Sequence, residues 1–325
     1  MAKPVAGQAD QPTALRRLMG NYGLEDTQMD VPEVAASIHS QFPEVPLSNI
    51  KLLGEGCDSW AFEVSQRWVF RFPKRADVDE QLLVESRIVP VLAAQSPMPL
   101  PTFCFLGQPS NSFPFHFVGY PKLPGVPAIQ VDPQALPFEH WAPAMGRFLS
   151  WLHRFPVSDA TRLGVHHQNV AELIEEVRAD ALDDFAVLHN VACSAPLKRW
   201  KGFFLNGTQP LTTTFGPVAA HRDLASEHVL FDLTTREITG GIDWTEIAVT
   251  DRCVDFAGFF HWGGEPCINA VLSNYDGSVD DGVLYRARFL AACRGVADVA
   301  FGLQTGRREY IQAGIRALGI CLGWT

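Results

Sequence analysis

Residues 221–255 read HRDLASEHVLFDLTTREITGGIDWTEIAVTDRCVD, and this stretch decides the fold. Asp223 stands near its start, His228 follows five residues later, and Asp243 comes after two β-like runs that flank the polar turn 233–236. Because a hairpin returns the chain to the place where it began, we expect Asp223 and His228 to lie close to Asp243. Two carboxylates and an imidazole that converge on one cleft suit phosphoryl transfer, which needs a base to orient a hydroxyl and ligands for a divalent metal.

Upstream of this segment, three short β-like runs predict an antiparallel meander. The runs are residues 49–53, 61–64 and 68–72, and Gly54, Glu55 and Gly56 separate the first two. Short apolar runs bounded by turn residues are typical of strands joined by hairpins.

Helices are expected mainly after this meander. The first is an exception: Asp30 is suited to cap a helix in which Val34, Ile38 and Phe42 fall on one face. Pro90 is expected to end or kink the next helix, which is predicted at residues 81–93. The other expected elements are helices at 81–93, 138–155 and 170–189, and strands at 113–120, 229–231 and 238–242.

The order of these elements predicts an α+β protein with two lobes. A Pro/Gly-rich hinge at residues 119–125 separates a small antiparallel β lobe from a larger, mainly helical lobe. The β lobe is assigned to residues 30–118 and the helical lobe to 126–325. Residues 1–29 are treated as an extension with one short helix around residues 13–20.

Composition excludes several classes of protein. The 325 residues are 47% hydrophobic, which is enough for a buried core and excludes a disordered chain. The net charge is −10, and no run of five or more Lys and Arg suggests nucleic-acid binding. No apolar stretch approaches the roughly 18–20 residues of a membrane span. The seven cysteines are scattered without a CxxC pair and no apolar signal segment begins the chain, so we expect a cytoplasmic protein with reduced thiols.

The motifs HRDLASEH, GIDW and DRCVDFA, in this order, resemble those of the aminoglycoside phosphotransferase family, which has a protein-kinase-like fold. The first motif matches the protein-kinase pattern H-R-D-L-x-x-x-N except at its last position, where His228 stands. The second has IDW where protein kinases have DFG, which is the usual form in the antibiotic kinases. The resemblance extends over about residues 48–320.

This resemblance implies roles for the residues of the motifs. Asp223 is the expected catalytic base, which orients the acceptor hydroxyl, and Asp243 is expected to bind the Mg²⁺ ions that bridge the nucleotide phosphates. His228 is a second metal candidate. Because Mg²⁺ prefers oxygen ligands, the alternative is that His228 holds Asp223 or a metal-bound water. Asp251 and Asp255 are expected to cap a helix and to brace the catalytic loop.

The β lobe is expected to bind the nucleotide. Gly54, Gly56 and Ser59 lie between two strands, where backbone N–H groups or the Ser59 hydroxyl can reach phosphates, although a plain turn is the alternative. Arg71 and Glu85 match the strand cation and the helix Glu of the kinase ion pair. Arg replaces the usual Lys there, but it keeps the charge and binds phosphate with its planar fork.

The hinge sequence GYPKLPG implies an adenine pocket by the same resemblance. Tyr120 is expected to guard the back of this pocket, while the Pro121 carbonyl and the Leu123 N–H meet the purine edge. An ordinary linker between lobes is the alternative. Lys74 is the fallback for Arg71, with solvent exposure as its alternative.

The sequence specifies the residues of the acceptor site less clearly. Two groups of acidic residues are candidates to meet the ammonium groups of an aminoglycoside, although a solvated helix face and a loop are the plainer explanation. The aromatic residues Phe259, Phe260 and Trp262 could line a pocket for a macrolide or belong to the core. The acidic residues are Glu172, Glu175, Glu176, Asp180, Asp183 and Asp184 in one group, and Glu265, Asp276, Asp280 and Asp281 in the other.

The sequence therefore predicts a Mg²⁺-dependent enzyme that transfers the γ-phosphate of ATP or GTP to a hydroxyl of a small molecule, most of all an aminoglycoside-type antibiotic. The alternatives are a kinase of the same fold that acts on a macrolide, an amino alcohol or a sugar-like metabolite, and a non-catalytic nucleotide-binding regulator. The expected partners are the nucleotide and the acceptor, with no nucleic acid and no membrane. The oligomeric state is not indicated.

Overall fold

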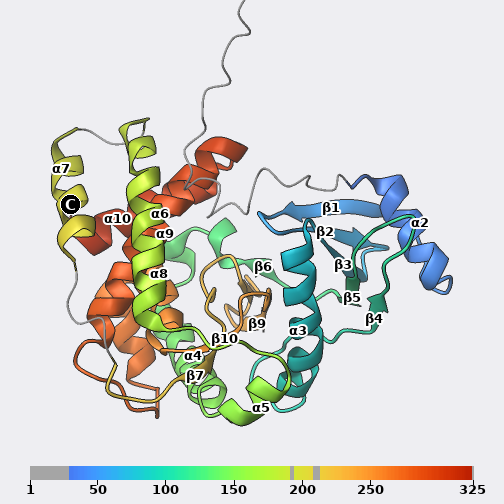
Figure 1. Ribbon diagram of the computed structural model, residues 1–325, viewed down its shortest axis with the longest axis horizontal. Helices are drawn as coiled ribbons and strands as arrows, with labels where there is room; N and C mark the ends of the chain where they lie inside the picture. The colour runs from blue at the N-terminus through green and yellow to red at the C-terminus, as the bar shows by residue number, and fades with distance from the viewer. Residues whose placement is uncertain (1–28, 191–193, 208–212, 324–325) are drawn as a thin grey trace, which may run out of the picture.

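The computed structural model describes residues 29–190, 194–207 and 213–323. A β-sheet with two flanking helices occupies one side of the molecule, and a larger group of helices occupies the other (Figure 1). The fold is therefore α+β with an antiparallel sheet, as predicted. The helix expected around residues 13–20 lies outside the described residues.

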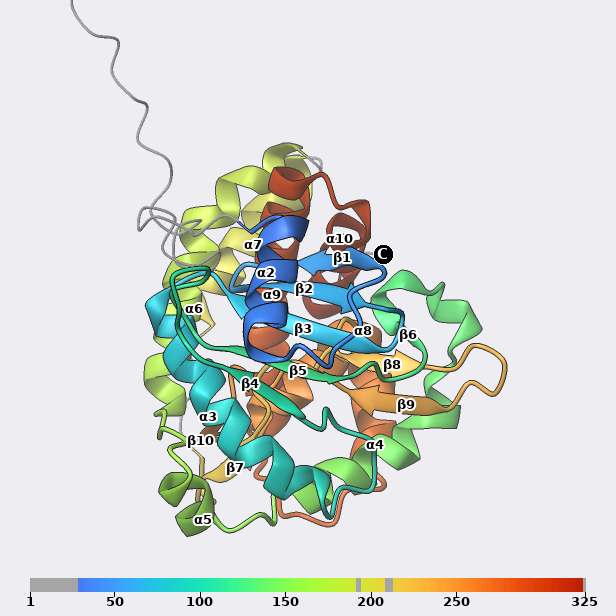
Figure 2. The same ribbon diagram turned by 90° about the vertical axis from the view of Figure 1, so that its right-hand side faces the viewer.

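The sheet has five antiparallel strands in the order β1-β2-β3-β5-β4 (Figure 2). The meander predicted from the first three runs is confirmed by the β1–β2 and β2–β3 ladders. The strands are β1 (Ile50–Glu55), β2 (Ser59–Val64), β3 (Trp68–Pro73), β4 (Phe105–Gly107) and β5 (Phe117–Pro121).

Three details of the sheet differ from the sequence prediction. Strand β1 continues through Gly54 and Glu55 after an irregularity in its pairing with β2, so the connecting loop is shorter than expected. Strand β5 begins only at Phe117, because residues 113–116 pack aromatic rings without joining the ladder. Strand β4 was not predicted: it has three residues, and β5 is its only strand partner in the described part of the chain.

Helix α2 (Val31–Gln41) covers one face of the sheet (Figure 2). It begins as predicted: the Asp30 carboxylate accepts from the Glu33 N–H at 2.9 Å, and the Glu33 carboxylate accepts from the Asp30 N–H at 2.8 Å. Such a capping box satisfies two backbone donors at once. Val34 and Ile38 then join a core of sheet aromatics that includes Phe70.

Helix α3 (Ala76–Ala93) links the sheet to the helical part of the molecule. It begins five residues before the predicted 81–93 segment, and it continues for three residues past Pro90 instead of ending there. Its buried residues Ile88, Val89 and Leu92 belong to the hydrophobic core of the helical part. The helix therefore fixes the position of its own Glu85 relative to both parts.

The helical part is built around α8 and α9. Trp141 of α4 stacks on Trp262 of α8 with ring centroids 4.3 Å apart. Helices α9 and α10 approach closely at two glycines, since a Cβ on Gly314 would lie 2.5 Å from the Gly295 carbonyl oxygen. The helices are α4 (Phe138–Leu152), α5 (Val157–Arg162), α6 (Val170–Asp184), α7 (Ser194–Asn206), α8 (Cys253–Leu272), α9 (Val283–Thr305) and α10 (Arg308–Leu322).

Short strands carry the segment that decided the fold. The predicted hairpin is confirmed as β8 (Val229–Phe231) and β9 (Ile238–Gly241), which pair antiparallel. Strand β6 (Val126–Pro127) pairs with β8, and β7 (Val218–Ala220) pairs with β10 (Ala248–Thr250). Residues 221–228 and 242–247 leave these strands on the same side of the molecule, where the site forms.

Three further features of the described residues concern the helix predicted at 170–189, the length of the apolar helices and the cysteines. The predicted helix 170–189 ends at Asp184 and continues as a 3₁₀ helix, Phe185–Asn190. No described helix is long and apolar enough to cross a membrane. Of the cysteines, Cys104 is exposed, Cys193 lies outside the described residues, and Cys253, Cys267, Cys293 and Cys321 are buried.

The Asp184 carboxyl makes folding stability depend on pH. Both of its oxygens are buried without a hydrogen-bond partner among the described residues, and burial, with the nearby charges of Asp180 and Asp183, raises its pKa to about 7. A carboxyl with a raised pKa in the folded state contributes stability at low pH that is lost as the pH rises through about 7. We expect Asp184→Asn to raise the free energy of unfolding by about 2 kcal/mol at pH 8.5 and by much less at pH 4.5.

Urea denaturation at the two pH values measures this difference. Asp183→Asn is the matched control, because Asp183 is exposed on the same helix. An equal gain from Asp184→Asn at both pH values would show that ionisation of the buried carboxyl is not its cause.

Candidate active site

The β8–β9 hairpin brings Asp223, His228 and Asp243 together. The His228 Nδ1 lies 2.7 Å from the Asp223 carbonyl oxygen and 3.3 Å from Asp223 Oδ2. The His228 Nε2 lies 3.8 Å from Asp243 Oδ2. The imidazole thus stands between the two carboxylates, as expected from a folded-back ribbon.

The loop that carries Asp223 is held by the buried carboxylate of Asp255. Asp255 Oδ2 accepts from the His221 N–H at 3.1 Å and Oδ1 accepts from the Arg222 N–H at 2.7 Å. His153 Nε2 lies 3.0 Å from the same Oδ2. These bonds fix Arg222 at φ +73°, a left-handed conformation that a long side chain rarely adopts. Asp255 therefore braces the catalytic loop.

Helix α8 lies directly against this loop. A Cβ on Gly258 would lie 1.8 Å from the Leu224 carbonyl oxygen, so only glycine permits the contact. Near the start of α8, Asp251 Oδ1 accepts from the Cys253 N–H at 2.7 Å, and Asp251 Oδ2 pairs with Arg286 at 3.1 Å. Asp251 and Asp255 thus cap and brace, and no hydrogen bond or ion pair among the described residues joins them to Asp243.

Arg71 of β3 connects the sheet to the Asp243 loop. Its Nη1 donates to both oxygens of Glu85, at 2.7 and 3.0 Å. Its Nη2 donates to Asp243 Oδ1 at 2.8 Å and to the Thr245 hydroxyl at 2.6 Å. The Trp244 N–H also donates to Glu85, at 3.1 Å. The Arg71–Glu85 pair expected from the sequence is thus present, and Asp243 shares its cation.

Charge pairing outweighs burial and keeps Arg71 and Asp243 ionised. Burial acts to lower the pKa of Arg71, but the carboxylates of Asp243 and Glu85 outweigh it, so the pKa lies above its usual value. Burial acts to raise the pKa of Asp243, but Arg71, with His228 and the Thr245 hydroxyl, holds it well below its usual range. Asp243 therefore remains a carboxylate at any physiological pH.

His228 is drawn toward its charged form. Burial acts to lower its pKa, whereas the carboxylates of Asp223, Asp243 and Glu227 raise it above the usual value for histidine. A protonated imidazole cannot bind a metal. These charges, and the bond to the Asp223 carbonyl, favour the alternative in which His228 holds Asp223 in place.

The groups around Asp243 suit a metal ion that takes most of its other ligands from nucleotide phosphates and water. Asp243 uses Oδ1 for Arg71 and Thr245, while the group found near its Oδ2 is the His228 Nε2, at 3.8 Å. Its side chain is 41% exposed, so a metal can approach this oxygen. Nowhere in the described ranges do three or more His, Cys, Asp or Glu side chains group to hold a metal. Mg²⁺ commonly takes only one or two protein carboxylates, with phosphates and waters completing its shell.

The glycine-rich loop is more tightly held than its sequence suggests. The Gly56 N–H donates to the Ser59 carbonyl at 3.0 Å, so this donor is already used within the turn. Arg75 Nη1 donates to the Cys57 carbonyl at 3.2 Å, and Arg75 Nη2 pairs with Asp58 at 2.7 Å. The Ser59 hydroxyl, in contrast, is buried and finds no hydrogen-bond partner within the described part of the chain.

Lys74 is buried instead of being exposed. Its side chain is only 3% exposed, and Nζ pairs with Glu55 at 2.8 Å. Nζ also lies 4.9 Å from the centre of the Trp60 ring. Lys74 therefore binds Glu55 of the glycine-rich loop, and Arg71 is the residue that pairs with Glu85.

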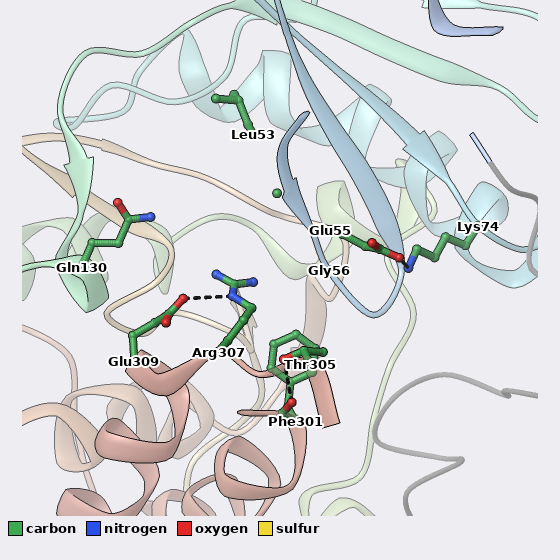
Figure 3. A pocket seen from close by; sticks show the side chains of 10 residues that line it. Leu53, Glu55, Gly56, Lys74, Gln130, Phe301, Thr305, Arg307 and Glu309 are labelled. Atoms are coloured by element: carbon green, nitrogen blue, oxygen red, sulfur yellow. Dashed lines mark hydrogen bonds and ion pairs between the residues drawn. The ribbon is translucent and has the colours of Figure 1, made fainter. Parts of the chain in front are cut away.

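A cavity of about 410 Å³ lies between the glycine-rich loop and the junction of α9 and α10 (Figure 3). Glu55 and Gly56 border one side, while Arg307 and Glu309 border the opposite side. The Arg307 Nε lies 2.9 Å from Glu309 Oε1. The lining residues are Leu53, Gly54, Glu55, Gly56, Lys74, Gln130, Phe301, Thr305, Arg307 and Glu309.

The hinge residues lie at the end of β5. Tyr120 is buried opposite Val69 of β3, with its ring 5.7 Å from that of Phe103. Pro121 is exposed and pairs with Trp68 at the end of the ladder. Leu123 lies beside β9: a Cβ on Gly240 would meet the Leu123 side chain at 2.7 Å. Buried Tyr120 and exposed Pro121 are compatible with the expected back and edge of a base pocket.

The acidic residues considered for the acceptor lie elsewhere. Asp180 and Asp184 face inward from α6, Asp276 pairs with Arg154, and Asp280 pairs with Arg286. Within the described residues, no hydrogen bond or ion pair joins any member of the two groups to Asp223 or Asp243. The aromatic side chains of Phe259, Phe260 and Trp262 are buried in the helical core.

Sequence reasoning missed two residues at the centre of the site. Arg294 of α9 donates to Asp223 Oδ1 at 2.5 Å and, with its other Nη, to Glu227. Glu227 lies inside the HRDLASEH motif, four residues after Asp223, so the sequence could have indicated a second carboxylate close to the base. Arg294 lies 71 residues from Asp223 along the chain and carries no motif, so nothing in the sequence singled it out.

Comparisons with known proteins found a matching family model and a similar bacterial protein. A model of the phosphotransferase enzyme family matches residues 49–290. The uncharacterized protein YcbJ of Bacillus subtilis (strain 168) is 25% identical over 308 residues, which cover 89% of this chain and 96% of that protein.

Solved structures are similar over nearly the same span. The GDP and kanamycin complex of APH(2")-IIia is 25% identical with a TM-score of 0.70, and the match covers 89% of this chain and 98% of that one. A macrolide 2'-phosphotransferase type I is also 25% identical, with a TM-score of 0.59 and coverages of 90% and 97%.

Replacement of Asp255 tests the brace of the catalytic loop. In Asp255→Asn, one oxygen becomes an NH₂ group that faces the N–H donors now bound by the carboxylate. We expect the free energy of unfolding to fall by about 3 kcal/mol, measured by urea denaturation, because buried donors lose their acceptor. Asp276→Asn is the control, since Asp276 is an exposed partner of Arg154. A loss no larger than that of the control would contradict the assignment.

Proposed function

Because this chain belongs to the phosphotransferase enzyme family, we propose that it transfers the γ-phosphate of a nucleoside triphosphate to a hydroxyl of a small molecule, with Mg²⁺ required. The observation that carries this proposal is the meeting of Asp223, His228 and Asp243 at the end of one hairpin, with His228 between the two carboxylates. A base and a metal ligand in one cleft are the two parts that phosphoryl transfer needs.

Asp223 is the proposed base. Its carboxylate orients the acceptor hydroxyl and accepts the proton as the new oxygen–phosphorus bond forms and the nucleoside diphosphate leaves. Two side chains hold this carboxylate in position, because Arg294 binds Oδ1 and His228 lies 3.3 Å from Oδ2. A base fixed in this way loses little conformational freedom when the acceptor binds, which lowers the entropic part of the barrier.

Asp243 is the proposed metal ligand, through Oδ2. When bound, Mg²⁺ neutralises the charge of the phosphates and of the departing diphosphate. Arg71 holds the other oxygen of Asp243 and is itself held by Glu85, so the carboxylate keeps one orientation. His228 is proposed to hold Asp223 in place instead of binding the metal.

The nucleotide is proposed to lie under the glycine-rich loop and against the hinge. The Ser59 hydroxyl has no hydrogen-bond partner among the described residues, so it is a candidate donor to a phosphate. Gly54 leaves open space beside the loop, because no described atom lies within 4 Å of a Cβ placed there. The Pro121 carbonyl and Leu123 N–H are proposed to meet the base beside Tyr120. ATP and GTP are both candidates, and GDP is bound by the relative described above.

The acceptor is proposed to be an antibiotic of the aminoglycoside or macrolide type. An aminoglycoside follows from the relative solved with kanamycin, and a macrolide follows from the macrolide 2'-phosphotransferase. The macrolide becomes a second candidate because four of the ten acidic residues considered for ammonium groups, Asp180, Asp184, Asp276 and Asp280, are buried or paired with arginines.

Removal of the base tests the enzyme function directly. We expect Asp223→Asn to lower acceptor-dependent release of nucleoside diphosphate by about a thousandfold or more, because the hydroxyl loses its proton acceptor, while nucleotide binding stays close to normal. A coupled assay over aminoglycosides, macrolides and amino alcohols measures turnover, and a fluorescent nucleotide measures binding. Asp281→Asn, on an exposed loop, is the control. Nucleotide binding without turnover of any acceptor would instead favour a non-catalytic regulator.

Metal removal tests the role of Asp243. We expect EDTA to abolish turnover and excess Mg²⁺ to restore it. Asp243→Asn should need at least about tenfold more Mg²⁺ for half-maximal turnover, because an amide oxygen carries no charge. The dependence of turnover on Mg²⁺ concentration measures both effects. Unchanged turnover in EDTA, or an unchanged Mg²⁺ requirement in the variant, would contradict this role.

A further inference from the structure

Five carboxylates beside the cavity, or on the loops that carry Asp223 and Asp243, have a basic partner from this same chain. These surfaces, from the glycine-rich loop to the α9–α10 junction, are together called the cleft. The pairs are Glu55 with Lys74 at 2.8 Å, Asp58 with Arg75 at 2.7 Å, Glu246 with Arg222 at 2.6 Å, Glu309 with Arg307 at 2.9 Å, and Asp243 with Arg71 at 2.8 Å.

Arg294 completes this pattern at the point of phosphate transfer. Its guanidinium bridges two carboxylates, since one Nη binds Asp223 and the other binds Glu227. The Arg294 side chain is 22% exposed and that of Glu227 only 8%. Burial acts to lower the pKa of Arg294, but Asp223 and Glu227 outweigh it, so the cation is retained. Breaking such a pair would leave a charge buried and alone, so Arg294 remains beside the base.

Helix α9 connects this point to the cavity. Arg294, Asp298, Phe301 and Thr305 follow one another at intervals of four, three and four residues, which places them along one face of the helix. The first binds Asp223, while the last two line the cavity. An acceptor whose hydroxyl reaches Asp223 can therefore extend along this face into the cavity.

The cavity end of this face offers aromatic surface and paired charge. The Arg307 guanidinium lies 4.5 Å from the centre of the Tyr310 ring and 5.7 Å from that of Phe301. It also pairs with the Glu309 carboxylate. Gln130 and Thr305 add uncharged polar groups. These surroundings suit hydroxyl, ether and apolar groups of an acceptor.

A polycationic acceptor would gain little in such a cleft. Ammonium groups are bound best by carboxylates that have no other cation. Here an ammonium would have to compete with the arginine or lysine that pairs with each carboxylate named above and, at Asp298 on the same face of α9, with His261 Nε2, which lies 2.9 Å from Asp298 Oδ2. Arg294 would also repel positive charge close to the reacting hydroxyl. The family model matches residues 49–290, so Arg294 and the α9–α10 junction lie beyond the matched segment.

We propose that the acceptor is a hydroxyl compound of low charge, with at most one cationic group, and that Arg294 is the residue that determines this specificity. The inference rests on the proposed phosphotransferase function and narrows its substrate class. Arg294 acts by occupying one oxygen of Asp223 and one of Glu227, and by repelling further cations from their neighbourhood. Its removal gives the cleft one more negative charge and opens it to polycations.

The test compares acceptors that differ in charge but keep their hydroxyl groups. Full-length protein with nucleoside triphosphate and Mg²⁺ is assayed with kanamycin, with fully N-acetylated kanamycin, and with a macrolide that has a single amine. We expect kcat/KM of the wild type to be at least about tenfold higher for the best low-charge acceptor than for kanamycin. Its KM should hardly change between low and high salt, because screening affects charged pairs most.

Variants then assign the specificity to Arg294. We expect Arg294→Gln to shift the ratio of kcat/KM by about tenfold toward kanamycin, through a lower KM for the polycation. Arg308→Gln is the matched control: it removes the same charge from an exposed position on α10 and should leave the ratio unchanged. If Arg294→Gln fails to fold, Arg307→Gln, which unpairs Glu309 at the cavity rim, carries the same expectation.

The outcomes separate this inference from the proposed function. A wild type that prefers kanamycin, with a KM that rises steeply with salt, would overturn the inference and leave the phosphotransferase function standing. An unchanged ratio in both Arg294→Gln and Arg307→Gln would remove Arg294 as the determinant and overturn the proposal as well. Absence of turnover with every acceptor would reject the function and, with it, the inference.

Discussion

The Arg71 guanidinium is the group on which the relation between the two parts of the molecule depends. It lies in the sheet, it binds Glu85 of α3 on one side, and it binds Asp243 and Thr245 of the loop after β9 on the other. Arg71 and Glu85 are almost fully buried, so removal of either one would leave the other as an unpaired buried charge, which costs several kcal/mol of stability. The requirement to pair these charges fixes the sheet, the helix and the Asp243 loop in one arrangement, and the proposed metal ligand is positioned as a consequence.

A second buried carboxylate has the corresponding role for the proposed base. Asp255 accepts the N–H groups of His221 and Arg222, and α8 lies against the same loop through Gly258. The two loops meet with unusual backbone conformations at Arg222 and at Asp243, both with positive φ. Such conformations persist where the surrounding structure over-determines them, and they are frequent at functional sites. The rigidity of the site therefore comes from buried hydrogen bonds behind it.

The charge of the cleft differs from the charge of the chain. The sequence carries a net charge of −10, which by itself suggests attraction for cations. Around the site, however, the carboxylates are paired with Lys74, Arg75, Arg222, Arg294 and Arg307. Electrostatic selection of an acceptor depends on the local pairing of charges more than on their total, because exposed charges farther away are screened by salt. The proposed selection of the acceptor therefore depends on Arg294 and on the α9–α10 junction, which lie beyond residues 49–290 matched by the family model.

The sequence by itself determined the local parts of this protein. The β1–β3 meander, the capped helix α2 and the β8–β9 hairpin follow from short-range patterns, and the hairpin is enough to bring Asp223 and Asp243 together. The pairing of Arg71 with Glu85 was predictable only through the family resemblance, because 14 residues and a change of secondary structure separate them. The three-residue strand β4 had no periodicity to reveal it. Only the tertiary structure decided that Arg294 lies beside the proposed base, that Lys74 is buried against Glu55, and that Asp180 and Asp184 of α6 are buried. Those contacts join residues far apart in the chain, and burial and charge pairing, which have no local signature in a sequence, select them.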